Sequence, residues 1–153
     1  MDQDAFRRTY RDVNERQCAY EKSVLTNQCE CALAERFCIA EREGVHCTSD
    51  EGQHQCLELL GLLREQARFA LRTDEDRGLL PHGKAIRIQV GGLRGLYKAL
   101  HPAEDSAPDP IPDVHALISR ARQAFGDLGA LPFSKIMQQV AAYRGRQRRS
   151  RRR

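Results

Sequence analysis

Mostly apolar side chains recur at helical spacing through the N-terminal part of the chain. The repeat steps alternately by four and three residues across residues 4–43, which keeps its members on one face of a helix. These members are Phe6, Tyr10, Val13, Gln17, Tyr20, Val24, Asn27, Cys31, Ala34 and Cys38. Gly44 is suited to end the helix, whereas Asn27 followed by Glu30 has the form of a capping box that would start a second one. We expect helix throughout this region, as one long element or as two.

A further helix is predicted over residues 50–72. Thr48 and Ser49 offer an N-cap, with Glu51 in the first turn. The apolar face of this helix consists of Cys56, Leu59, Leu60, Leu63, Ala67 and Ala70. Because only a short loop separates it from the preceding helical region, we expect the two to pack as an antiparallel helical hairpin or small bundle.

The middle of the chain changes its pattern. Residues 84–90 alternate with a period of two, which predicts a short extended segment. Gly91 and Gly92 end this segment, and residues 93–100 are expected to form a short helix. The stretch from Gly92 to Gly95 matches the GXXG loop of KH nucleic-acid-binding modules. The surrounding pattern of a KH module is not visible, so we interpret the match as an ordinary turn entering a helix.

Two helices are predicted near the C-terminus, after a proline-rich linker at residues 101–112. Asp113 is placed to cap the first of them, and Pro132 begins the second. The expected fold is therefore mainly α. We expect a cysteine-bearing helical domain over residues 1–100 and C-terminal helices over residues 113–143 that pack on the same body.

Composition adds a basic tail to this picture. Residues 144–153 hold seven arginines and no acidic residue, namely Arg144, Arg146, Arg148, Arg149, Arg151, Arg152 and Arg153. Without these seven of the 25 basic residues, 18 remain against 21 acidic ones. We expect the tail to be disordered because it lacks apolar residues to bury. Its charge suits a protein partner, and nucleic acid is the alternative.

The six cysteines are concentrated in one part of the chain. The first is Cys18, the last is Cys56, and none follows. The chain shows no secretory signal peptide and no run of apolar residues that would span a membrane. We therefore expect a cytoplasmic location, where clustered cysteines usually serve metal or redox chemistry and not structural disulfides.

The predicted helical hairpin determines which cysteines should converge. Folding about Cys47 places Cys38 opposite Cys56, and Cys31 supplies a fourth thiolate, with Cys29 as the alternative. Four thiolates suit a [4Fe–4S] cluster or a structural zinc ion. Zinc sites usually show tight C-x2–4-C knuckles, which are missing here, so we favour the cluster.

These observations lead to one functional hypothesis and two alternatives. The hypothesis is a small iron–sulfur protein that acts in electron transfer or as an accessory subunit of a larger redox enzyme, and not as a catalyst itself. The first alternative is a zinc-stabilised helical module that binds nucleic acid or a protein through its tail. The second is a thiol–disulfide redox sensor. No nucleotide-binding loop or hydrolase triad supports an enzymatic function.

Overall fold

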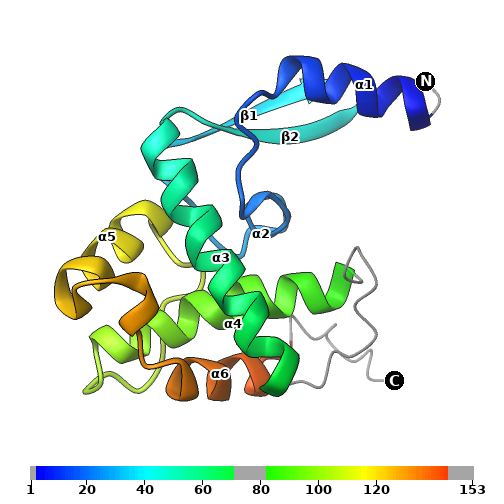
Figure 1. Ribbon diagram of the computed structural model, residues 1–153. Helices are drawn as coiled ribbons and strands as arrows, with labels where there is room; N and C mark the ends of the chain where they lie inside the picture. The colour runs from blue at the N-terminus through cyan, green and yellow to red at the C-terminus, as the bar shows by residue number, and fades with distance from the viewer. Residues whose placement is uncertain (1–2, 71–81, 145–153) are drawn as a thin grey trace, which may run out of the picture.

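The computed structural model describes residues 3–70 and 82–144, and these are mainly helical, as expected. In chain order they form α1 (Gln3–Val13), α2 (Glu21–Leu25), β1 (Ala34–Ile39), β2 (Arg42–Cys47), α3 (Asp50–Ala70), α4 (His82–Leu100), α5 (Val114–Phe125), the 3-10 helix η1 (Leu128–Ala130) and α6 (Phe133–Ala142). The two strands and α1 lie at one end of the molecule, and α4, α5 and α6 lie at the other (Figure 1). Helix α3 runs between the two ends and contacts β2 as well as α4, α5 and α6.

The expectation of helix throughout residues 4–43, as one element or as two, is wrong. The region contains α1, the five-residue α2 and then an antiparallel pairing of β1 with β2. Asn27, which we expected to begin a second helix, has a left-handed φ of 60° and follows the end of α2. That conformation turns the chain away from the helical path.

A tight turn explains why residues 34–47 form strands. Ile39 pairs with Arg42, so the two strands are joined by two residues, and Ala40 takes a φ of 56° there. Phe37 and Ile39 are the least exposed residues in the second half of β1, while Cys38 between them is exposed. Phe37 and Ile39, which lie outside the helical repeat, are therefore the covered residues of this strand, whereas Cys38, a member of that repeat, lies on its open face.

Helix α3 is confirmed, but its partner is not another long helix. Ser49 Oγ accepts a hydrogen bond from the Gly52 N–H at 3.0 Å, as an N-cap residue should. The predicted face is buried as far as Ala67, whereas Ala70 is exposed. Cys47 ends β2 directly before this helix, so the helical hairpin that would have faced Cys38 toward Cys56 does not form.

The extended segment expected over residues 84–90 is also wrong, because these residues are the first half of α4. The helix continues without a break through the residues predicted to be a separate helix. Ile88 and Val90 are buried, and so are Gly91, Gly92 and Leu93. A helix that is covered on several sides carries apolar residues around its circumference, and this hides the helical period.

The glycines of α4 are contact points with neighbouring helices. A Cβ atom on Gly91 would lie 2.7 Å from the Cα of Val140, and one on Gly95 would lie 2.8 Å from the Cα of Ile136. Both contacts are with α6, which packs more extensively on α4 than any other described helix does. The GXXG match is therefore part of a helix interior that lets two backbones approach closely, and the turn that we expected there is absent.

Both C-terminal helices are confirmed. Asp113 accepts a hydrogen bond from the Ala116 N–H at the start of α5, and Pro132 directly precedes α6. The proline-rich residues 101–112 form no helix or strand, but Ile111 is buried and forms a parallel β-bridge with Cys29. This segment therefore fastens an N-terminal loop to the rest of the molecule. Of the arginine-rich tail, only Arg144 belongs to the described residues.

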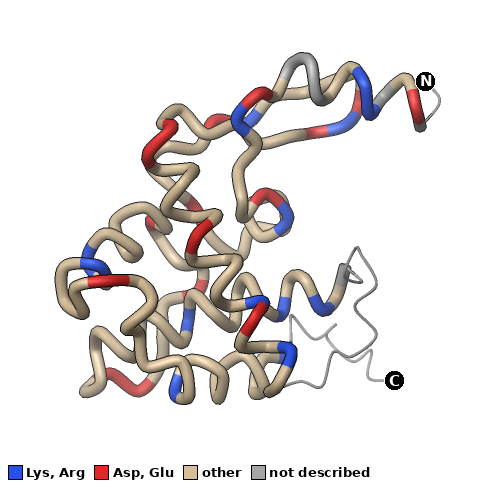
Figure 2. The backbone as a smooth tube through the Cα atoms, in the orientation of Figure 1, with Lys and Arg blue, Asp and Glu red and all other residues tan. Residues whose placement is uncertain are grey.

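The elements from α1 to α3 carry charged residues of both signs, whereas α4, α5 and α6 carry Lys and Arg but no acidic residue (Figure 2). Among the helices within residues 3–70 and 82–144, none is long and apolar enough to cross a membrane.

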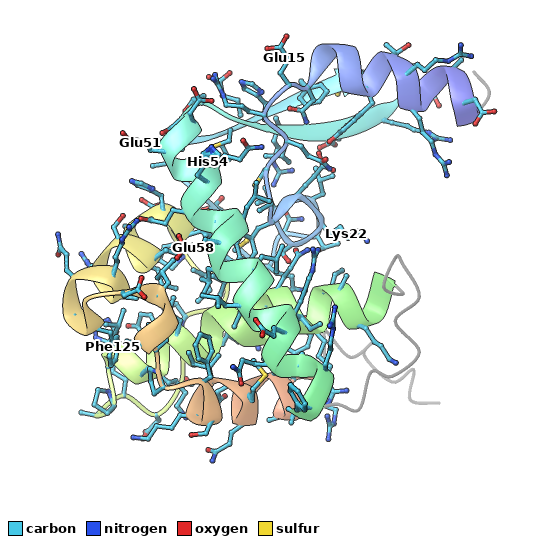
Figure 3. All side chains as sticks on the ribbon, in the orientation of Figure 1. Glu15, Lys22, Glu51, His54, Glu58 and Phe125 are labelled. Carbon is cyan, nitrogen blue, oxygen red and sulfur yellow. The ribbon has the colours of Figure 1, made fainter. Side chains whose placement is uncertain are left out.

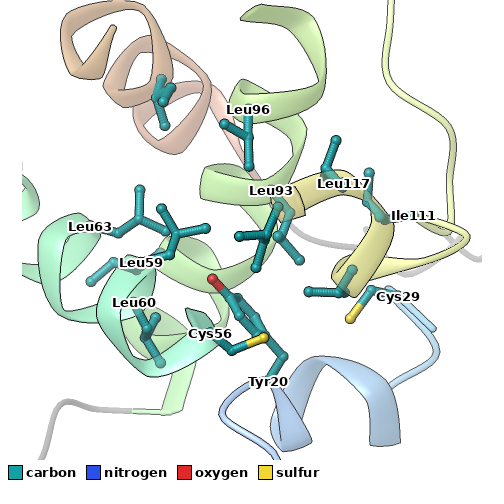
Figure 4. Packing of buried hydrophobic residues seen from close by; sticks show 14 of the residues in the cluster. Tyr20, Cys29, Cys56, Leu59, Leu60, Leu63, Leu93, Leu96, Ile111 and Leu117 are labelled. Atoms are coloured by element: carbon teal, nitrogen blue, oxygen red, sulfur yellow. The ribbon is translucent and has the colours of Figure 1, made fainter. Parts of the chain in front are cut away.

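The core holds one tyrosine whose hydroxyl group has no partner among the described residues. Tyr20 is 1% exposed and lies beside Cys56, with its ring reaching toward Leu59 and Leu93 (Figure 4). A buried hydroxyl without a hydrogen bond costs about 1–3 kcal/mol of desolvation.

Tyr20→Phe should therefore leave stability unchanged or raise it by about 1 kcal/mol in the metal-free protein. Tyr10→Phe is the matched comparison, since the Tyr10 hydroxyl is hydrogen-bonded to Glu21 and Asn14. That variant should lose about 1 kcal/mol. Urea unfolding of the two variants measures both effects, and a clear loss for Tyr20→Phe would show that the Tyr20 hydroxyl has a partner.

Candidate metal centre

Five of the six cysteines lie close together in the fold. Cys18, Cys31, Cys47 and Cys56 line one cavity of about 20 Å³. Cys29 is fully buried; the charges of Cys18 and Cys31 act on its thiol, and its own charge acts on the thiol of Cys56. Three of the four predicted ligands, Cys31, Cys47 and Cys56, therefore meet at one place, and so does the alternative ligand Cys29.

The fourth predicted ligand, Cys38, is not part of this cluster. It is exposed on β1 and pairs across the sheet with Glu43. Along β1 it lies four residues from Ala34, the partner of Cys47, which is a separation of roughly 13 Å. Its place at the cavity is taken by Cys18, which the helical hairpin would have kept apart from the other thiols.

Backbone hydrogen bonds between the loop after α1 and strand β2 place Cys18 and Cys47. The Cys18 N–H donates to the carbonyl oxygen of Val45 at 3.0 Å, and the Cys47 N–H donates to that of Arg16 at 2.7 Å. The Cys47 thiol itself donates to the carbonyl oxygen of Ser49 at 3.3 Å. The loop therefore lies along the edge of the hairpin and holds two thiols beside the start of α3.

A second set of backbone contacts fixes the loop that carries Cys29 and Cys31. The Glu30 N–H donates to the carbonyl oxygen of Ile111, and the Val114 N–H donates to that of Glu30, both at 2.9 Å. This loop is thereby attached to the N-terminal end of α5, more than eighty positions later in the sequence. The cavity lies between four separate parts of the chain, including α3, which supplies Cys56.

Two backbone N–H groups point at the thiol of Cys31. One belongs to Leu33 and the other to His115 in the first turn of α5, and both hydrogen bonds lower the pKa of Cys31. A helix N-terminus also favours negative charge. Burial nevertheless has the larger effect, so the pKa of Cys31 is raised overall. The two N–H groups would therefore stabilise a Cys31 thiolate if a cation offset the cost of burying its charge.

Burial also raises the pKa of three further thiols, those of Cys18, Cys29 and Cys56. It raises the pKa of Cys18 and of Cys29 to about 12, and that of Cys56 still further. The charges of the neighbouring cysteines add to this effect; four of them act on Cys56. Without a cation, these thiols are therefore neutral at neutral pH.

The raised pKa of Cys29 predicts how the metal-free protein responds to alkali. The thiol ionises near 9.0 when unfolded and near 12 when folded. Below about pH 9 both states keep the proton, and above it only the folded state does, so stability is lost as the pH rises from 9 toward 12. The loss is about 1.4 kcal/mol per pH unit for such a thiol.

Urea unfolding between pH 8 and 10, in the presence of a reductant, measures this dependence. Cys29→Ala should flatten it, because one of the shifted groups is then missing. A bound metal should remove the part of the loss that comes from its thiolate ligands, since these are already deprotonated. If stability is flat over this range without metal, the thiols are not buried as described.

Three polar residues that were not predicted as site residues also line the cavity. His115, Tyr20 and Gln53 line it, whereas His54 is exposed on α3 with Glu51 and Glu58 (Figure 3). The spacing of the cysteines along the chain did not indicate that Cys18 or His115 would lie at the site. Only the packing of α5 against the Cys29–Cys31 loop brings His115 to the site.

Within residues 3–70 and 82–144, no three His, Cys, Asp or Glu side chains stand in an arrangement that could hold a metal ion as they are placed. Binding of a metal would require thiols to rotate about their side-chain torsions. All six cysteines are free.

The chain was also compared with known proteins. It matches no protein-family model, no curated protein and no solved structure. The site is therefore interpreted from its own geometry and chemistry.

Proposed function

We propose that this protein binds a [4Fe–4S] cluster through Cys18, Cys31, Cys47 and Cys56, with Cys29 as an alternative ligand. The observation that carries the proposal is the convergence of these four thiols, from four separate segments, on one cavity. Thiols that converge in this way can act together as ligands of one metal or cluster. A cluster so bound would supply one-electron transfer, and the protein would act as an electron carrier or as an accessory subunit of a larger redox enzyme.

The chemistry of the donor set supports this proposal. Soft thiolates are the usual ligands of iron–sulfur clusters. Backbone N–H groups already hydrogen-bond to the thiols of Cys18 and Cys31, and hydrogen bonds to sulfur help to set the potential of such a cluster. The apolar walls of the cavity include Val24, Leu33 and Val114, which make the surroundings of the thiols largely apolar.

The size of the cavity favours one alternative, a single zinc ion. About 20 Å³ is the space of a water molecule, and a cluster would require the walls to move further apart than one ion would. Four thiolates can also bind zinc tetrahedrally. In that case the metal would be structural, and the protein would bind nucleic acid or a protein partner through its arginine-rich tail.

Anaerobic purification followed by analysis of iron, acid-labile sulfide and zinc tests the proposal. The cluster should appear as four iron and four sulfide per chain, with a brown colour and absorbance near 400 nm. Stoichiometric zinc without iron, both after purification and after reconstitution with iron and sulfide, would refute the cluster in favour of the zinc site. Uptake of neither metal would refute both and leave a thiol–disulfide function.

A further inference from the structure

A groove lies between α4, α6 and the end of α5. Its volume is about 430 Å³, which is enough for a ligand of small-molecule size or for a few side chains of a peptide. Its polar lining residues are Lys98, Lys135, Gln138 and Gln139, and its apolar lining includes Phe125. We call it the α4–α6 groove.

The two lysines of the α4–α6 groove lack an acidic partner. Neither Lys98 nor Lys135 forms an ion pair within residues 3–70 and 82–144, and none of the described residues that line the groove is acidic. Helices α4 and α6 themselves carry no acidic residue (Figure 2). Arg94 on α4 differs, because it pairs with Asp109 at 3.4 Å. The groove is therefore a positive region that attracts a negatively charged group.

Apolar side chains line the same groove. Ala99, Phe125 and Pro132 are half-buried there, and aromatic side chains are enriched where proteins bind one another. Gln138 and Gln139 add amide groups that can both donate and accept hydrogen bonds, as the backbone of a peptide does. This combination suits a peptide that carries acidic and apolar side chains.

Acidic residues near the groove favour a peptide over a nucleic acid. Glu104 and Asp127 are exposed, and each stands two positions after a residue of the groove, namely Pro102 and Phe125. A nucleic acid carries a negative charge at every phosphate, so its backbone would be repelled where it leaves the groove. An acidic peptide can instead place its carboxylates only where the lysines lie.

We infer that the α4–α6 groove binds an extended acidic segment of a protein partner. Carboxylates of this segment pair with Lys98 and Lys135, and one of its large apolar side chains packs on Phe125. The inference is independent of the proposed function, because no described residue lines both the groove and the cavity of the cysteines.

Selection from a phage-displayed library of random peptides against the full-length protein tests the inference. The enriched peptides should combine several acidic residues with a large apolar one. Lys98→Glu and Lys135→Glu should each weaken binding of a selected peptide by about tenfold or more in fluorescence anisotropy, because like charges then face each other. Lys84→Glu is the matched control, since Lys84 lies on α4 but does not line the groove, and it should bind the peptide as the wild type does.

The arginine-rich tail is the same in all these variants, so a difference between them reports on the groove. Equal affinity of Lys98→Glu, Lys135→Glu and the wild type would overturn the inference, because another surface would then hold the peptide. Enrichment of peptides without acidic residues would overturn it as well. A poly-uridine RNA that loses affinity in both variants, when no acidic peptide is enriched, would replace the peptide by a nucleic acid.

A measurement on the wild-type protein decides the question if a variant does not fold, which far-UV circular dichroism detects. Addition of a selected peptide should shift the backbone amide NMR signals of Lys98, Lys135 and Gln138 and leave that of Lys84 in place. Shifts confined to residues outside the groove would overturn the inference.

Discussion

In the protein loaded with the proposed cluster, replacing Cys56 by serine should remove most of the iron, whereas Cys38→Ser should leave the iron content unchanged. Cys56 is buried at the cavity together with Cys18, Cys31 and Cys47. Serine is a poor substitute because its hydroxyl group ionises far less readily than a thiol. The alkoxide that it forms is also a hard ligand in the place of a soft thiolate. The same loss is expected for Cys18→Ser, Cys31→Ser and Cys47→Ser. Iron and sulfide analysis and the absorbance near 400 nm give the result directly.

Cys38→Ser is a sharp control because Cys38 was a predicted ligand and the fold leaves it exposed on β1. Loss of iron in this variant would mean that the hairpin is rearranged when the cluster binds. Cys29→Ser distinguishes the alternative ligand: it should retain iron if Cys18 is the fourth ligand and lose it if Cys29 is. Far-UV circular dichroism of each variant separates loss of metal from loss of fold.

Gly95→Ala should destabilise the protein by roughly 1–3 kcal/mol, toward the upper end of that range. The added Cβ would lie 2.8 Å from the Cα and 2.9 Å from the carbonyl oxygen of Ile136. Both atoms belong to the backbone of α6, so they cannot rotate out of the way as a side chain would. Relief of the clash requires α4 and α6 to move apart, which opens the core around Leu96.

The matched control is Gly61→Ala in α3, where nothing lies within 4 Å of the added Cβ. Gly61 is exposed in the middle of a helix, so alanine should stabilise the protein by about 1 kcal/mol. The two substitutions are chemically identical and should act in opposite directions. Thermal or urea unfolding measures both, and a stabilising Gly95→Ala would mean that α4 and α6 are further apart than described.

The amino-acid sequence by itself determined the helices whose ends and apolar faces are local properties. Helix α3 has its N-cap at Ser49 and one apolar stripe, and α5 has its N-cap at Asp113. In each case the capping hydrogen bond and the buried face depend on residues a few positions apart. The concentration of cysteines before residue 57 likewise indicated where a site should lie.

Tertiary structure alone decided the rest. Ala34 and Cys38 continue a helical repeat, whereas Phe37 and Ile39 suit a strand, and only pairing across the turn at Ala40 selects the strand. The first half of α4 looked extended because packing on several sides conceals its period. Gly91 and Gly95 by themselves weaken a helix, and they suit this one because α6 approaches them closely.

The composition of the cavity follows from the same cause. Cys18 replaces Cys38 because the hairpin turns Cys38 outward and draws the loop after α1 along β2. His115 arrives with α5, whose contact with the Cys29–Cys31 loop joins residues far apart in the chain. Spacing along a chain predicts neighbours only within one regular element, whereas the free energy of burying thiols and apolar side chains together depends on which distant segments meet.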